Sequence, residues 1–138
     1  MPSWQKIDMF DLPSSLIPYT AVVNVTHDPM DFVYRYWGSG MTEVQEQEST
    51  NCSVNDLEPD FISQAIFQAY NDVIHRAEPV YIINTYRNEN KLLIEDHFLR
   101  LPLSDTGTTV DMVMSIYKTS NSSFKQLSSL DSYSNSLS

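Results

Sequence analysis

"DFVYRYWGSG", residues 31–40, alternates cleanly from Phe32 to Trp37 and then stops at two glycines. In a strand, successive side chains point to opposite faces. One face would carry Phe32, Tyr34 and Tyr36, and the other Val33, Arg35 and Trp37. A surface strand normally shows one polar face, so rings on both faces predict that each face is covered by core, by a partner or by a ligand.

A second strand is predicted immediately before this stretch. In "YTAVVNV", residues 19–25, the residues alternate as in a strand. The turn sequence "THDPMD", residues 26–31, separates the two strands, and its Asp-Pro pair is strong turn chemistry. The two strands are therefore expected to pair as an antiparallel hairpin.

A long helix is predicted from about residue 60 to residue 77. Pro59 suits a first helical position, and Asp60 suits the positive end of the helix. Apolar residues recur at helical spacing, which predicts one apolar face. The residues of this face are Ile62, Ile66, Ala69, Tyr70, Val73 and Ala77.

Three further strands are predicted after this helix, at residues 80–87, 91–103 and 110–118. Short helical turns are predicted at residues 41–48 and in the loop that follows, before the long helix. Two strands, small helices, a long helix and three strands define an α+β domain. We expect one five-stranded antiparallel sheet with the long helix over one face and a short N-terminal helix.

The composition limits the classes of partner and of metal site that this protein can have. The chain has 138 residues and a formal charge of −10, with its eight Lys and Arg residues scattered along it. This charge opposes binding to nucleic acid and to anionic membranes. Cys52 is the single cysteine, so an intrachain disulfide and a multi-thiolate metal site are excluded, and no metal is predicted.

One folded domain is expected over residues 1–118, with a helical cap at about 1–18. The segment 119–138 is rich in Ser and poor in apolar residues, which predicts a disordered tail. No apolar run approaches the roughly 20 residues that span a membrane. The start of the chain lacks the pattern of a secretory signal, so a cytoplasmic location is expected.

The order of elements and two local signatures resemble the PAS-fold superfamily. "DFVYRYWGS" resembles the "FRYRLVGT" signature of short, single-domain PAS-like proteins of proteobacteria. "RLPLSDTGTTVDMVM", residues 100–114, resembles their "LPLSDDGxxVDxL" signature. The resemblance implies a cavity between the long helix and the inner face of the sheet. It also implies that an N-terminal helix or a partner covers the outer face.

Two cofactors known from PAS domains are disfavoured by the residues. The helical phase places His75 opposite the apolar face, toward solvent, which argues against haem ligation. Cys52 lies two residues before the position, Val54, at which flavin-binding PAS domains would have their reactive cysteine. It is predicted to be a small, partly buried structural thiol.

His97 is the candidate for an enzymatic alternative. A histidine inside a cavity and near a carboxylate such as Asp111 would suit a general base in a small cone-shaped isomerase or hydratase. The structural alternative is a histidine at the sheet margin with one hydrogen bond. Neighbouring residues of a strand point to opposite faces, so Asp96 is not expected to orient His97.

The candidate pocket consists of aromatic, aliphatic and polar side chains of the predicted helix and strands. Its predicted members are Tyr34, Tyr36, Ile66, Tyr70, Tyr81, Ile83, His97, Met112 and Met114. Structural roles are expected for the signature residues Phe32, Arg35, Gly38, Pro102, Asp105, Gly107 and Asp111. Among these, Gly107 is expected to have a positive φ, Asp105 to cap its turn and Arg35 to pair with a carboxylate on a neighbouring strand.

The sequence predicts a non-enzymatic sensory or ligand-binding module that signals through a separate protein. A small molecule or a partner would shift the packing of helix against sheet, and a homodimer face would transmit the change. Trp4, Ile7 and Phe10 recur three apart and predict an apolar patch that docks on the sheet or on a second subunit. The alternatives are the His97 enzyme and a dimeric adaptor without a ligand.

Overall fold

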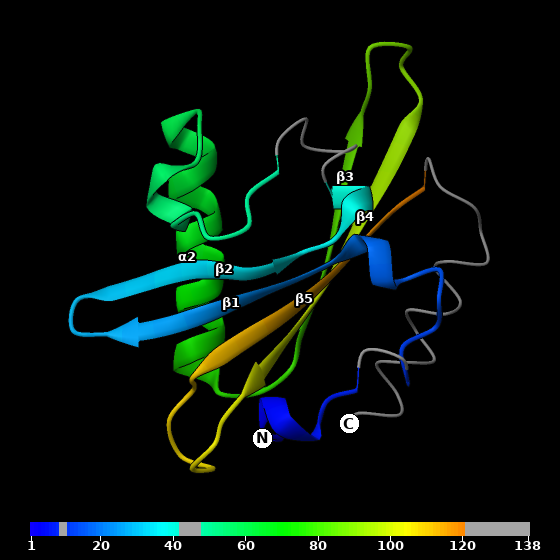
Figure 1. Cartoon of the computed structure of the whole chain (residues 1–138). Helices are drawn as coiled ribbons and strands as arrows, with labels where there is room; N and C mark the ends of the chain where they lie inside the picture. Colours follow the sequence, from blue (N-terminus) through cyan, green and yellow to red (C-terminus); the bar gives the residue numbers. More distant parts are fainter. Residues whose placement is uncertain (9–10, 42–47, 121–138) are drawn as a thin grey trace.

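The computed structural model describes residues 1–8, 11–41 and 48–120 and contains one five-stranded antiparallel sheet (Figure 1). The strands lie in the order β2-β1-β5-β4-β3. Their bounds are β1 Thr20–His27, β2 Met30–Trp37, β3 Val80–Arg87, β4 Leu93–Leu103 and β5 Met112–Thr119. The helical elements are the 3-10 turns η1 Trp4–Lys6, η3 Ile17–Tyr19 and η4 Val54–Asp56, and the helix α2 Asp60–Arg76. The predicted α+β class is confirmed.

The predicted hairpin forms, but a bulge interrupts the alternation of β2. Val22 pairs with Tyr36 and Val23 with Tyr34, so Arg35 is an extra residue without a partner on β1. One extra residue exchanges the faces beyond it. Phe32, Tyr34 and Trp37 therefore share one core, whereas Tyr36 packs against the other, which corrects the prediction that Phe32, Tyr34 and Tyr36 share a face.

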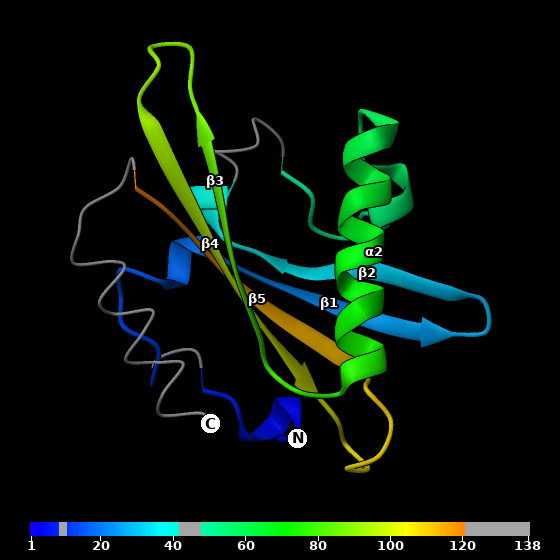
Figure 2. The same cartoon turned by 180° about the vertical axis from the view of Figure 1, so that it is seen from behind.

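Helix α2 covers β2, β1 and β5, and the β3–β4 hairpin extends beyond it (Figure 2). The helix starts after Pro59 and stops where Ala77 adopts a left-handed conformation, with φ of 51°. Its buried side chains are Ser63, Tyr70 and Val73. Ile62, expected on this face, is exposed, and Ala77 lies just past the helix end. His75 is exposed, as predicted.

Two hydrophobic clusters lie on the two faces of the sheet. The cluster on the inner face, toward α2, contains Phe32, whose ring centre lies 5.1 Å from that of Phe67 and 5.3 Å from that of Tyr70. The cluster on the outer face joins the N-terminal segment to the strands. Its buried members are Leu12, Leu16, Val22, Leu99, Leu101, Leu103, Met114 and Ile116. Both faces of the central strands are thus covered.

The N-terminal segment packs on the outer face through 3-10 turns rather than through an α-helix. Trp4 and Ile7 pack against the outer cluster, so this part of the predicted patch docks on the sheet. The amide of Ser104 donates to the carbonyl of Pro2 at 2.8 Å. Phe10, most of the turns predicted at 41–48 and nearly all of the predicted tail lie outside the described residues, and Thr119 still belongs to β5.

Gly38 and Gly107 have the local roles that glycine serves best. A Cβ on Gly38 would lie 2.2 Å from the carbonyl oxygen of Pro18, so no other residue fits there without a shift. Gly107 has φ of +85°, as expected for the β4–β5 turn. Ser104, rather than the predicted Asp105, caps this turn, because its Oγ accepts from the amide of Gly107 at 2.8 Å. The carboxylate of Asp111 in turn accepts from the amide of Asp105 at 2.8 Å.

Arg35 does not form the predicted ion pair with any described residue. The bulge leaves its side chain exposed, and its guanidinium lies 5.9 Å from the ring centre of Trp4. The β1–β2 hairpin is connected to η4 by a hydrogen bond, because the Asp31 carboxylate accepts from Oγ of Ser53, the N-cap of η4, at 2.7 Å. No helix in the described part of the chain is long and apolar enough to cross a membrane.

Candidate functional site

An open groove of about 420 Å³ lies between α2 and the β3–β4 hairpin. The hairpin extends past the helix, and small residues on that side of α2 leave the space open. The groove is lined by Ile62, Ala65, Ile66, Ala69, Ile82, Asn84, Phe98 and Arg100. Its volume falls in the range of about 300–1,000 Å³ that is usual for sites of small molecules.

Arg100 is the one charged side chain of this lining. Only 8% of its surface is exposed, and its guanidinium carbon lies 4.9 Å from the ring centre of Phe98 and 5.7 Å from that of Tyr70. Both distances are within the range of cation–π contact. Its Nε has no hydrogen-bond partner, and no ion pair joins it to the residues that the structure describes. The groove therefore has a buried cation in an otherwise apolar wall.

Two tyrosines and a serine lie under the helix next to Arg100. Ser115 Oγ donates to the hydroxyl of Tyr70 at 3.2 Å. Burial raises the pKa of Tyr34 well above its usual range, and the neighbouring Tyr70 hydroxyl raises it further. Arg100 lowers it only in part. The Tyr34 hydroxyl therefore stays neutral at physiological pH and provides no negative charge for Arg100.

The inner face also carries a carboxylate further along β4. Asp96 pairs with Asn84 across the strands and faces the hydroxyls of Tyr86 and Tyr117. Burial raises the pKa of Tyr117 above its usual value, and the Asp96 carboxylate adds to this. Asp96 and Arg100 are four residues apart on one face of a strand, which separates them by about 13 Å.

The structure distributes the nine predicted pocket residues over both faces of the sheet. Ile66 lines the groove, and Tyr34 and Tyr70 lie in the core beneath it. Tyr36, Met112 and Met114 belong to the outer cluster, the first because of the bulge and the other two by alternation along β5. Tyr81, Ile83 and His97 are also outer-face residues, since they pair in register with Leu99 and with one another. The prediction of one pocket is corrected accordingly.

His97 lies outside the groove and far from Asp111, the carboxylate named for the enzymatic alternative. Its Nδ1 lies 2.6 Å from the hydroxyl of Tyr81, and its Nε2 lies 3.5 Å from a carboxylate oxygen of Glu95, on the outer face. Asp111 adjoins the end of β4 where Leu103 pairs with Met112, six residues from His97 and thus about 20 Å away. Neither residue lines the groove.

His75 and Cys52, which the sequence disfavoured as cofactor residues, do not line the groove. His75 is exposed, and its Nδ1 bonds to the carbonyl of Asn71 at 2.8 Å. Cys52 is partly buried in the loop before η4, where its carbonyl accepts from the amide of Tyr34 at 3.0 Å. Covalent flavin chemistry at Cys52 does not fit this position, because the thiol is not part of the lining.

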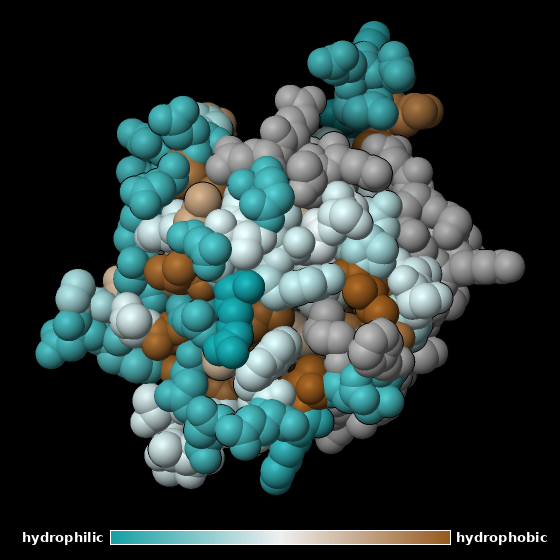
Figure 3. All heavy atoms as spheres, viewed as in Figure 1, coloured by the Kyte–Doolittle hydropathy of each residue, from teal (hydrophilic) through white to brown (hydrophobic). Residues whose placement is uncertain are grey.

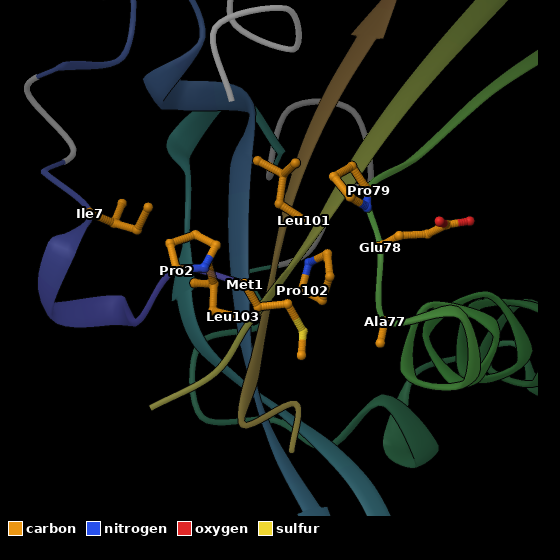
Figure 4. A pocket seen from close by; sticks show the side chains of 9 residues that line it. All are labelled: Met1, Pro2, Ile7, Ala77, Glu78, Pro79, Leu101, Pro102 and Leu103. Carbon is orange, nitrogen blue, oxygen red and sulfur yellow. The ribbon is translucent and has the colours of Figure 1, made fainter. Parts of the chain in front are cut away.

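A second, smaller cavity of about 170 Å³ lies where the N-terminal segment meets β4 and the connection between α2 and β3 (Figure 4). Figure 4 shows Pro2 and Ile7 on one side, Leu101, Pro102 and Leu103 in the centre, and Ala77, Glu78 and Pro79 on the other. The side chains of its lining are apolar except for that of Glu78. This cavity is a small gap where the packed segments meet, and its side chains form no cluster of polar groups that would bind a ligand.

The sequence interpretation did not identify Arg100, Asn84, Ile82 and Phe98. The signal was present in "HFLRLPL", residues 97–103, where an arginine interrupts an apolar strand. In a strand with one face in an apolar cluster, alternation puts Arg100 on the face of Phe98 and opposite Leu99. That face could not be identified as the cavity side until the position of the helix was known.

No protein-family model matches the chain, and no curated protein matches it either. Solved structures do match. The VqmA dimer of Vibrio cholerae, determined without its target DNA, has a TM-score of 0.53 at 10% identity over 73% of this chain. The match covers 45% of that chain, so this chain spans about half of the length of VqmA. A structure of VqmA bound to DPO has a TM-score of 0.51 at 9% identity, covering 75% of this chain and 53% of VqmA.

A light-oxygen-voltage protein of Rhodobacter sphaeroides also matches, with a TM-score of 0.51 at 11% identity. The match covers 86% of this chain and 72% of the other. Such low identities show the fold alone. With the strand order and the long helix over one face, they place the chain in the PAS-type α+β fold.

Proposed function

We propose that this protein is a sensory module that binds a small molecule in the groove between α2 and the β3–β4 hairpin. The observation that carries the proposal is the groove of about 420 Å³ with apolar walls and a buried guanidinium. Mostly apolar clefts with a few convergent polar groups are the usual form of small-molecule sites. VqmA, which has a similar fold, is known bound to DPO, and this agrees with the proposal.

Binding would act by shifting the balance between two arrangements of α2 and the hairpin. A ligand that contacts both sides of the groove favours the arrangement in which they are closer together. The β3 strand is at the edge of the sheet and pairs with β4 alone among the described strands, so the hairpin can move without breaking the pairing of β1, β2 and β5. A separate cytoplasmic signalling protein would detect the change.

The test is mass spectrometry of the purified protein under native and denaturing conditions. A companion mass that is released on denaturation supports the proposal. Ala69→Phe, which fills the groove from α2, should remove the companion, whereas Gln68→Phe, on the exposed side of the helix, should retain it. A companion that both variants retain would place the ligand elsewhere and contradict the proposal.

We infer further that the module works as a homodimer through the outer face of the β3–β4 hairpin. Ile83 is 51% exposed and Leu93 is 58% exposed there, and Tyr81 is exposed on the same face. The chain has a formal charge of −10, so an apolar surface suits a second copy better than charged pairs do. Figure 3, which views the face opposite α2, shows apolar atoms beside hydrophilic ones at the tip of this hairpin.

Ile83→Glu tests the dimer. A carboxylate in the centre of an apolar interface loses its hydration, so the variant should be monomeric at concentrations at which the parent is dimeric. Sedimentation equilibrium measures this, and Gln68→Glu, an exposed residue of α2, is the control. An unchanged dimer in Ile83→Glu would exclude this face, and a monomeric parent protein would exclude the homodimer.

A further inference from the structure

We propose that the groove selects a small carboxylate with an apolar body, and that Arg100 binds the carboxyl group. The inference rests on the proposed function, because it specifies the chemistry of the same site. It assigns Arg100 the role of the residue that determines ligand class.

The guanidinium of Arg100 is incompletely bonded. Its side chain is 8% exposed and lines the groove, its Nε has no hydrogen-bond partner, and no ion pair joins it to any residue in 1–8, 11–41 and 48–120. Arginine remains charged in proteins. A buried charge is costly unless it is paired and hydrogen-bonded. The site is thus complete only when an anion occupies the groove.

The aromatic neighbours of Arg100 do not replace that anion. Phe98 and Tyr70 stabilise the positive charge through their ring faces, at 4.9 and 5.7 Å. They accept no hydrogen bonds from the N–H groups in the plane of the guanidinium. A carboxylate matches that planar arrangement, because its two oxygens accept two parallel hydrogen bonds.

The other polar groups of the inner face do not occupy the position of a counter-ion next to Arg100. The hydroxyl of Tyr34 stays protonated because burial raises its pKa. Asp96, about 13 Å away along β4, faces Tyr86 and Tyr117 rather than Arg100. The protein therefore provides the cation and its aromatic support, but no counter-ion next to it among the described residues.

The remaining lining defines the rest of the ligand. Ile62, Ile66, Ile82 and Phe98 form apolar walls, and Ala65 and Ala69 leave space between them. Asn84 is the other polar residue, and its amide suits a single hydrogen-bonding group. One guanidinium without a lysine suits a single carboxylate better than a phosphate, and the apolar walls suit an alkyl or aryl body.

The test is isothermal titration of the full chain with matched acids and amides. The probes are 3-phenylpropionate and hexanoate, against 3-phenylpropanamide and hexanamide. We expect each acid to bind about 10- to 100-fold more tightly than its amide, as for a hydrogen-bonded charge pair. Arg100→Gln should remove this difference and Arg100→Lys should restore part of it. Arg35→Gln, which removes an exposed arginine from the same sheet, should change nothing.

The outcomes separate the ligand class from the function. If acids and amides bind equally and Ala69→Phe blocks both, the groove is a binding site but the role of Arg100 is refuted. If none of the probes binds the parent protein at millimolar concentration, the carboxylate inference is refuted, and the companion mass described above decides the function independently. If Arg100→Gln fails to fold by circular dichroism, the ratio of acid to amide affinity in the parent protein still decides the inference.

Discussion

Lys118 lies near the end of β5 and is almost completely buried. Its Nζ is 4.1 Å from the centre of the Tyr19 ring, and His97 lies opposite it on β4. Burial lowers the pKa of Lys118 to about 8. At a pH between about 8 and the ordinary lysine pKa of 10.5, Lys118 is protonated in the unfolded chain but deprotonated in the folded chain. Stability must therefore rise with pH in this interval.

We expect the free energy of unfolding to rise by about 1–2 kcal/mol between pH 7.5 and 9.5, allowing for solvent screening. Above about pH 10 the trend reverses, because burial raises the pKa of Tyr34 and Tyr117 and the unfolded chain then loses protons first. Urea unfolding at several pH values measures this. Lys118→Met should flatten the rise and Lys6→Met, an exposed control, should keep it. An equal rise in Lys118→Met would show that Lys118 is not its source.

The predictions for individual residues succeeded where they depended on local conformation. The positive φ of Gly107 and the exposed position of His75 follow from turn and helix geometry within a few residues. The ion pair expected for Arg35 was wrong, because the bulge turns this residue outward. The two faces of β2 could not be assigned from alternation alone, since one extra residue near Tyr34 exchanges them.

The N-terminal segment and α2 cover opposite faces of the same sheet. Leu16 is 0% exposed in the outer cluster, although it precedes the first strand in a segment without an α-helix. The hydroxyl of Thr20 donates to the carbonyl of Leu16 at 2.8 Å, which fixes the turn that leads into β1. The segment is therefore an integral layer of the fold.

Leu16→Ala should lower the free energy of unfolding by about 2–5 kcal/mol, because it removes buried methyl groups and leaves a cavity. Leu92→Ala is the control, since Leu92 is 59% exposed and its change should be within about 0.5 kcal/mol. Urea unfolding of the two variants gives both values. If Leu16→Ala lowered the free energy of unfolding as little as Leu92→Ala does, the N-terminal segment would not contribute to the core.

The elements themselves could be predicted from the sequence better than their faces. The strands, the hairpin turn and the start of α2 follow from alternation, Asp-Pro and Pro59. The buried face of α2 is rotated about the helix axis relative to the predicted face, because the sequence of the helix contains more than one apolar stripe. Phe67 and Ile74 pack on the core, whereas Ile62 lines the open groove. Which stripe becomes the core depends on the position of η4, where Ser63 Oγ donates to the carbonyl of Val54 at 2.7 Å.

The molecule as a whole is a twisted sheet whose helix leaves the outer part of the β3–β4 hairpin uncovered (Figure 2). This offset creates the groove, because β3 and β4 extend beyond α2. The fold class could be predicted from the order of the elements, but the offset could not, since it depends on how the helix crosses the sheet. The groove residues Asn84 and Arg100 became recognisable only through that crossing.

We propose that this groove binds a small molecule. The most direct measurement is a titration of the ¹⁵N-labelled chain with 3-phenylpropionate, followed through its amide resonances. We predict saturable shifts at Ile66, Ala69, Ile82 and Arg100, with resonances of the outer-face residues Leu101 and Met114 unchanged, and no such shifts in Ala69→Phe. Shifts confined to the outer face, or the same shifts in Ala69→Phe, would contradict the account.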